Sequence, residues 1–277
     1  MRVSYLGPPG TFNEDALRES AAGAEIEGIP SPSVHDAIAA VERGEADRAL
    51  VPFENSVEGS VRTALDALAL DVEGVTIVGE HDFRVRHCLI AREQLPLEQI
   101  TAVLSHPQPL AQCARFIREQ LPAAKPLSAA STADAVRRVS ESDQPWAALG
   151  ARGAAALYGC AILREGVEDS EENVTRFVWI APEGTEAVGP GPWKTSLVFS
   201  ELGEDHPGAL VEVLLEFSRR RINLSRIESR PLRSGLGRYM FFIDLEGRIG
   251  EQGVEDAIAG LRDKAESVRL LGSYPTG

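Results

Sequence analysis

Thr175 and Arg176 stand side by side at the start of an apolar run, "FVWI" at 177–180, that has the composition of a buried strand. A threonine hydroxyl can donate a hydrogen bond to a departing oxygen, and a guanidinium can bind a carboxylate through two parallel hydrogen bonds. Polar residues in this position can therefore act on a bound ligand. The alternative is that they only mark the point where the strand leaves water.

Hydroxyl residues precede three predicted helices, each three residues ahead of a side chain that can bond back to the chain: Thr11 and Glu14, Ser105 and Gln108, Ser131 and Asp134. This is the spacing of the capping box, which is a purely structural device. Helix N-termini also bind carboxylates, and in open α/β sheets they gather near the strand ends. The pattern therefore predicts that these three helix starts either carry ordinary caps or together form a site for a small anion.

A fourth junction has three polar residues in a row, Glu54, Asn55 and Ser56, directly after a predicted buried strand at 48–53. Because Asn and Ser are common in turns, the segment can simply be a turn before a helix. It can equally form the rim of a substrate site.

The elements that must position these residues alternate between strand and helix. Strands are predicted at 3–6, 25–29, 48–53, 75–80, 100–105, 125–129, 146–150 and 176–180, and helices at 11–22, 33–43, 59–69, 107–120, 131–142 and 150–158. This alternation is typical of an α/β fold with a mostly parallel sheet. We expect residues 81–92 to form one long strand that crosses between two lobes.

A segment rich in Gly and Pro at 183–193 predicts a linker between two domains, 1–182 and 194–277. The second domain is predicted to run strand, helix, strand, strand, helix, strand, which is the ferredoxin-like plan (βαββαβ). Its first helix is expected to have Pro207 in the first turn, where a missing N–H costs nothing.

The composition excludes several classes of function. The chain has 277 residues and a formal net charge of −14, so a nucleic-acid partner is not expected, and an anionic ligand needs a local positive potential. No apolar run reaches the roughly 20 residues that span a membrane, and the first residues lack a signal-peptide pattern. Cys88, Cys113 and Cys160 are far apart, which favours a cytoplasmic location and argues against zinc.

Seven short motifs follow one another along the chain: "GPPGTF", "VPFENSVEG", "SHPQPLAQC", "STADA", "NVTRF", "GAL" and "ESRP". With these motifs the chain resembles the single-function prephenate dehydratases that end in an ACT regulatory domain. The resemblance implies two periplasmic-binding-protein-like lobes, about 1–80 plus 160–182 and about 81–159, followed by the ACT domain. It implies conversion of prephenate to phenylpyruvate without cofactor or metal, regulation by phenylalanine, and a homodimer or homotetramer.

The resemblance also implies roles for individual residues. Thr175 would be catalytic, with Asn55 and Ser56 orienting the departing group, and Arg176 would bind a substrate carboxylate in preference to pairing with Glu54. Substrate-binding residues would be Thr11, Glu54, Ser105, His106, Gln108, Ser131 and Thr132. His106 can instead only shape the turn before Pro107, and the chain departs from the family pattern at Asn13 and Glu14. The other histidines, His35, His81, His87 and His206, are predicted to be surface or packing residues.

Phenylalanine is expected to bind at two motifs of the C-terminal domain: Gly208, Ala209, Leu210 and Val211 at a helix start, and Glu228, Ser229, Arg230 and Pro231 on a strand. Two alternatives to a prephenate dehydratase stay open at this point. Arogenate can replace prephenate as the substrate, or the chain can be an amino-acid sensor without catalysis.

Overall fold

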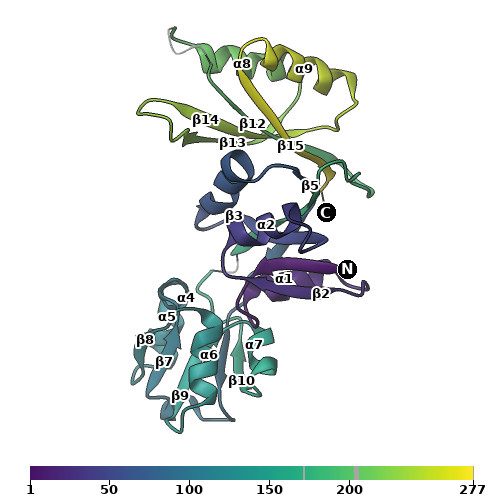
Figure 1. Ribbon diagram of the computed structural model, residues 1–277. Coiled ribbons are helices and arrows are strands. Elements are labelled where there is room, and N and C mark those ends of the chain that lie inside the picture. The colour runs from purple at the N-terminus through teal and green to yellow at the C-terminus, as the bar shows by residue number, and fades with distance from the viewer. Residues whose placement is uncertain (171, 203–205, 277) are drawn as a thin grey trace.

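The computed structural model describes residues 1–170, 172–202 and 206–276, which form two lobes and a C-terminal domain in a row (Figure 1). The first lobe, in the middle of the row, has the strands β1 (Arg2–Leu6), β2 (Glu27–Ser31), β3 (Arg48–Asn55), β5 (Val75–Arg84) and β11 (Val174–Pro182). Its helices are α1 (Phe12–Ser20), α2 (Val34–Glu42) and α3 (Arg62–Asp66), with a hairpin strand β4 (Gly59–Ser60) and a π-helical turn at Ala67–Asp71.

The position of β11 in this sheet decides where the Thr-Arg pair lies. The strand order is β2-β1-β3-β11-β5, and β11 is antiparallel to both of its neighbours. Thr175 therefore lies opposite Asn55 of β3 and Phe83 of β5. The start of β11 and the end of β3, which carries the Glu-Asn-Ser junction, meet at one edge of the sheet.

The second lobe is built on the strands β6 (Cys88–Ala91), β7 (Ala102–Ser105), β8 (Lys125–Ser128), β9 (Trp146–Gly150) and β10 (Ala161–Glu165), in the order β10-β6-β9-β7-β8. Its helices are α4 (Pro107–Gln112), α5 (Ala114–Gln120), α6 (Thr132–Ser140) and α7 (Arg152–Leu157), with a 3₁₀ turn at Leu97–Gln99. The expected single strand at 81–92 is wrong. The strand is interrupted between Arg84 and Cys88, where the chain passes from β5 in one sheet to β6 in the other, so the lobe limits lie later than predicted.

The C-terminal domain has the predicted ferredoxin-like order. Its elements are β12 (Trp193–Ser200), α8 (Ala209–Arg219), β13 (Leu224–Pro231), β14 (Tyr239–Glu246), α9 (Gln252–Arg262) and β15 (Ser267–Pro275), with the antiparallel order β13-β14-β12-β15. Both helices cover one face of the sheet (Figure 1). The placement of Pro207 in the first helical turn is wrong, because the helix begins at Ala209 after a left-handed turn at Gly208 (φ 100°).

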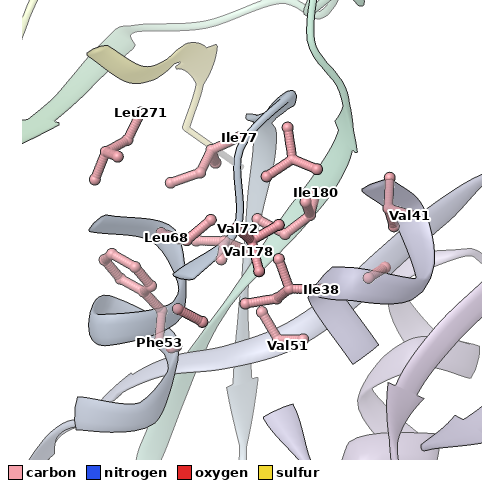
Figure 2. Close-up of a cluster of buried hydrophobic side chains, with 14 of the residues drawn as sticks. Ile38, Val41, Val51, Phe53, Leu68, Val72, Ile77, Val178, Ile180 and Leu271 are labelled. Carbon is pink, nitrogen blue, oxygen red and sulfur yellow. The ribbon is translucent and has the colours of Figure 1, made fainter. Parts of the chain in front are cut away.

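The C-terminal domain continues the sheet of the first lobe. β15 runs parallel to β5 where Gly272 pairs with Ile77. A Cβ at position 272 would lie 2.2 Å from the carbonyl oxygen of Ile77, so this close approach requires glycine. Buried side chains of both units belong to one apolar cluster, in which Leu271 lies near Ile77 (Figure 2). The free face of the C-terminal sheet is therefore packed against the first lobe.

Candidate active site and effector pocket

A cleft of about 470 Å³ opens between the two lobes, and Thr175 lies in its wall. The cleft is bordered by the ends of β1 and β3 and the start of β11 from the first lobe, and by the starts of α4 and α6 from the second. The predicted site residues that line it are Thr11, Asn55, His106, Gln108, Ser131, Thr132 and Thr175. Strand ends and helix starts from both lobes thus converge, as expected for open α/β sheets.

The side chain of Asn55 fixes the hydroxyl of Thr175. Its Oδ1 atom accepts hydrogen bonds from the backbone N–H groups of Val57 and Glu58, each at 2.9 Å. This orients the amide so that Nδ2 donates to Thr175 Oγ1 at 2.9 Å. Since the hydroxyl oxygen already accepts from Asn55, its proton is left for a group in the cleft.

Two amide side chains that the sequence-based site did not include extend this cluster. Asn173 Oδ1 accepts from Asn55 Nδ2 at 2.8 Å, and Asn173 Nδ2 donates to Gln112 Oε1 at 3.4 Å. Both residues line the cleft. Their only signal in the sequence is their place within the motifs "NVTRF" and "SHPQPLAQC".

His87 is the third addition, and the prediction that it is merely a surface or packing residue is incomplete. Its ring packs edge-on against Phe12, is almost fully buried, and lines the cleft. Gln112 Oε1, an acceptor for Asn173, lies 3.0 Å from His87 Nε2. His87 therefore donates from Nε2 and presents Nδ1 as an acceptor, a tautomer assigned from the hydrogen-bond network.

Some of the buried polar atoms that have no partner among the described residues belong to side chains of the cleft. They include Thr11 Oγ1, His87 Nδ1 and Gln112 Nε2, and all three residues line it. A buried polar atom without a partner costs about 1–3 kcal/mol, so such atoms are rare unless a ligand or water completes them. The cleft thus offers a hydroxyl, an imidazole acceptor and an amide donor to a polar ligand.

Helix N-termini supply the positive potential of the cleft. No lysine or arginine occurs in its described lining, and Glu58 adds a carboxylate. The N-termini of α1 and α6 lie at Thr11 and Ser131, and Ser131 Oγ accepts from Asp134 N at 3.0 Å as a cap. These ends carry partial positive charge and free N–H groups, which favour carboxylates.

The capping box predicted at Thr11 does not form. Glu14 accepts the N–H of Gly10 at 2.6 Å, and the Thr11 side chain makes no cap hydrogen bond. The Thr11 hydroxyl is therefore available to a ligand.

The predictions that Ser105 binds substrate and caps a helix are wrong. Ser105 is fully buried as the last residue of β7, and its Oγ donates to the carbonyl of Leu149 in β9 at 2.8 Å. The helix cap is His106 instead, whose Nδ1 accepts from Gln108 N at 3.3 Å. β7 extends through Ser105, so the helix cap falls one residue later, at His106.

Ser56 supports the site without lining the cleft. Its Oγ donates to the carbonyl of Glu172 at 2.6 Å and accepts from the N–H of Val174 at 3.0 Å. These bonds fix the backbone just before Thr175, so the direct role expected for Ser56 is replaced by one in holding the start of β11.

The substrate-binding roles expected for Arg176 and Glu54 are also wrong. Successive side chains of a strand point to opposite faces, so Arg176 points away from the cleft that Thr175 faces. Its Nη2 atom lies 3.2 Å from Glu54 and 2.8 Å from Asp244 of the C-terminal domain. The alternative expectation, that Arg176 pairs with a structural carboxylate such as Glu54, is confirmed.

Comparisons with known proteins give the family of this chain. Residues 3–185 match the family model of prephenate dehydratase, and residues 201–263 match that of the ACT domain. The chain belongs to the prephenate dehydratase family. It is 39% identical over 285 residues to the prephenate dehydratase of Mycobacterium tuberculosis (strain H37Rv), with 100% of this chain and 88% of the relative covered.

Two solved structures are similar to this chain over nearly its whole length, but their names give different activities. The prephenate dehydratase of Arthrobacter aurescens in complex with L-Phe is 40% identical with a TM-score of 0.90, covering 99% of this chain and 90% of that one. GqqA, named a novel type of quorum quenching acylase, is 31% identical with a TM-score of 0.88, covering 100% of this chain and 98% of that one. A shared fold can host different reactions, so the reaction depends on the residues of the site.

The ACT domain of this chain has a pocket of about 290 Å³, just below the usual range for ligand sites. Its lining includes three predicted effector residues at the start of α8, together with aromatic side chains of β14: Gly208, Ala209, Leu210, Tyr239 and Phe241. Val211, the next residue of the motif, lies outside this lining and is 58% exposed.

The second effector motif is divided between two faces of β13. Arg230 donates to both carboxylate oxygens of Asp66 in the first lobe, at 2.7 Å each, and Glu228 lies 2.8 Å from Arg226. These contacts correct the expectation that Glu228 and Arg230 bind the effector. Ser229 and Pro231, which alternate with them along the strand, are exposed on the opposite face.

The buried imidazole predicts a pH-dependent stability. Burial lowers the pKa of His87 below its ordinary value of 6.5, against the weaker effects of Gln112 and Glu168. The unfolded chain therefore takes up this proton at a higher pH than the folded one, and the contribution of neutral His87 is lost as pH falls below about 6.5. Between about pH 7.5 and 5.5, we expect wild type to lose more unfolding free energy than His87→Gln, measured by urea unfolding. Equal losses would contradict this assignment.

Proposed function

We propose that the protein dehydrates and decarboxylates prephenate to phenylpyruvate in phenylalanine biosynthesis. The observation that carries the proposal is the Thr175 hydroxyl, whose oxygen is held by Asn55 at 2.9 Å and whose proton is left for the cleft. In this reaction the ring C–O bond and the C–C bond to the ring carboxylate both break. The C–C electron pair makes the ring aromatic, carbon dioxide leaves, and the departing hydroxide takes a proton to become water.

Thr175 acts on the departing oxygen. Negative charge develops on that oxygen as the C–O bond stretches, so a hydrogen bond from a fixed hydroxyl becomes stronger in the transition state. A threonine hydroxyl is too weak an acid to give up its proton, so the proton that completes the water comes through solvent in the cleft. The hydrogen bonds from Val57 and Glu58 through Asn55 hold and polarise the hydroxyl.

The substrate carboxylates are assigned to the helix N-termini. The described lining holds no lysine or arginine, and it places Thr11, Gln108 and Thr132 at the starts of α1, α4 and α6, with Gln112 at the end of α4. Thr11 Oγ1 and Gln112 Nε2 have no partner among the described residues. Both atoms can donate to a carboxylate.

The proposal includes inhibition by phenylalanine at the ACT pocket, with a second copy of the chain completing the site. β13 is an edge strand, and Ile227 on it is 48% exposed, as is Tyr239 at the start of β14. An unpaired edge with exposed apolar side chains favours pairing with another copy. We expect analytical ultracentrifugation to show a homodimer or homotetramer. We also expect the protein to be located in the cytoplasm. None of the described helices is long and apolar enough to cross a membrane.

Gly208→Ala is expected to weaken phenylalanine binding about tenfold. Gly208 lines the pocket with φ 100°. An L-residue in this left-handed region costs about 1–2 kcal/mol, and we expect the turn to move in order to relieve this strain, which would displace the groups that bind phenylalanine. Calorimetric titration with phenylalanine measures the change. The matched control is Gly253→Ala in α9, where a Cβ meets nothing within 4 Å and affinity should not change. Equal affinities of the two variants would place the effector elsewhere.

The proposed activity is tested with purified wild type and prephenate at neutral pH, following phenylpyruvate by its alkaline ultraviolet absorption. Turnover supports the proposal. Turnover of arogenate alone would change the substrate. No turnover of either, together with tight phenylalanine binding, would instead make the protein an amino-acid sensor.

A further inference from the structure

Thr175 and Arg176 link the start of β11 to the cleft on one side and to the ACT sheet on the other. Thr175 faces the cleft, while the guanidinium of Arg176 leaves the dehydratase domain and meets Asp244 of the ACT sheet at 2.8 Å. The two residues share a peptide bond at the start of β11. A movement of the ACT sheet that displaces Arg176 therefore acts on the backbone that carries the Thr175 hydroxyl.

The contact between Arg176 and Asp244 is buried and fixed from the ACT side. The two side chains are 11% and 1% exposed. Asp244 Oδ1 accepts from Ser196 Oγ at 2.6 Å, and Ser196 Oγ lies 2.7 Å from the Tyr274 hydroxyl. Because Ser196 gives its proton to Asp244, Tyr274 donates to Ser196. Asp244 thus moves with β12, β14 and β15 together.

Two cations, Arg176 and Lys194, meet three carboxylates around this contact. Lys194 donates to both oxygens of Glu80 at 2.7 Å each, and Glu80 also lies 3.4 Å from Arg176. Although burial opposes the charge, the attraction of Asp244 in particular raises the pKa of Arg176 above its ordinary value, so it stays protonated. Without the Asp244 charge, Arg176 still has Glu54 and Glu80, so an amide at position 244 should be tolerated.

Strand β13 of the ACT sheet contacts the cleft wall by a second route. Arg226 of β13 donates to Ser60 Oγ at 2.7 Å, and Ser60 in β4 lines the cleft. Arg226 and Arg176 both lie over the ring of Phe53, with their Cζ atoms 5.1 and 5.0 Å from its centroid. The ACT sheet therefore reaches residues on either side of Asn55: Phe53 and Glu54 before it, and Ser60 after it.

We propose that Arg176 is a positioning residue through which the ACT domain, by way of Asp244, sets the place of the Thr175 hydroxyl. When the effector shifts the ACT sheet, Arg176 follows Asp244, the start of β11 moves, and the bond from Asn55 to Thr175 is weakened. The kinetic side of this inference rests on the proposed dehydratase function, whereas the mechanical link does not.

The link is tested without turnover by hydrogen–deuterium exchange, with and without saturating phenylalanine, in wild type, Asp244→Asn and Arg176→Lys. Arg176→Lys keeps the charge but loses the planar fork. The matched control is Glu216→Gln, a buried ACT carboxylate paired with Arg220 and Lys264, which follow the ends of α8 and α9, at 2.7 and 3.3 Å. We expect phenylalanine to change exchange at 174–178 in wild type and Glu216→Gln, but only within the ACT domain in the other two variants.

Kinetics on the same proteins add a second readout. Arg176→Lys should lower kcat roughly tenfold to a hundredfold with KM for prephenate little changed, as a small misplacement of a catalytic group does. The factor by which phenylalanine and a substrate analogue weaken each other's binding, typically roughly 5- to 150-fold, should fall to about one in Asp244→Asn. An Asp244→Asn protein that keeps the exchange change, or a wild type that shows none at 174–178, would overturn the proposal. If wild type makes no phenylpyruvate, the dehydratase function fails, and the exchange data still decide the link.

Discussion

Thr175→Val is expected to lower kcat roughly 10²–10³-fold, which is the usual effect of removing one fixed hydrogen-bond donor from a developing oxyanion. Valine matches threonine in shape and lacks only the hydroxyl, so packing at this 8% exposed position should be preserved. KM for prephenate should change little, because the hydrogen bond gains its strength in the transition state. Steady-state formation of phenylpyruvate measures both constants.

Thr175→Ser is the matched control, since it keeps the hydroxyl and loses only a methyl group. We expect it to retain most of the wild-type kcat, with Asn55 still able to donate to its oxygen. A valine variant as active as the serine variant would show that the hydroxyl is not used in the reaction.

Phe53→Ala is expected to lower the free energy of unfolding by about 3–5 kcal/mol, the usual cost of deleting a fully buried aromatic side chain. Phe53 is 0% exposed within the cluster that joins the first lobe to the ACT domain (Figure 2). Its ring also lies under the guanidinium groups of Arg176 and Arg226. Urea unfolding followed by circular dichroism measures the loss.

Phe53→Leu separates the two contributions of this ring. Leucine keeps much of the apolar volume but offers no aromatic face to a cation, and that face is worth about 0.5–2 kcal/mol. We therefore expect a clearly smaller loss of stability than for alanine. If both variants were as stable as wild type, the cluster would not hold the domains together as described.

Much of the fold could be predicted because the local signals agree with the global structure. The apolar runs of β1, β3, β9 and β11 lie where the pattern placed them. Thr11, Ser131 and Thr175 reach one cleft because strand ends and helix starts meet at the same edge of such sheets. That rule needs only the order of elements, which the sequence displays.

The errors have a common physical cause, which is that local pattern does not fix register or packing partners. Whether Ser105 ends a strand or begins a helix is a matter of one residue, and the outcome moves its hydroxyl from the cleft to the carbonyl of Leu149. The partner that Arg176 meets, Asp244, lies 68 residues away in another domain, so no local pattern could identify it. His87 carries no motif, and only the crossing between the lobes brings it to Gln112.

A double-mutant cycle on kcat tests whether Asn55 acts through the hydroxyl of Thr175. The four proteins are wild type, Asn55→Ala, Thr175→Val and the double variant, each checked for folding by circular dichroism. If Asn55 only orients the hydroxyl, its loss should matter little once the hydroxyl is absent, so the double variant should be about as slow as Thr175→Val alone. Losses that multiply would show that the two side chains act independently and would contradict the account.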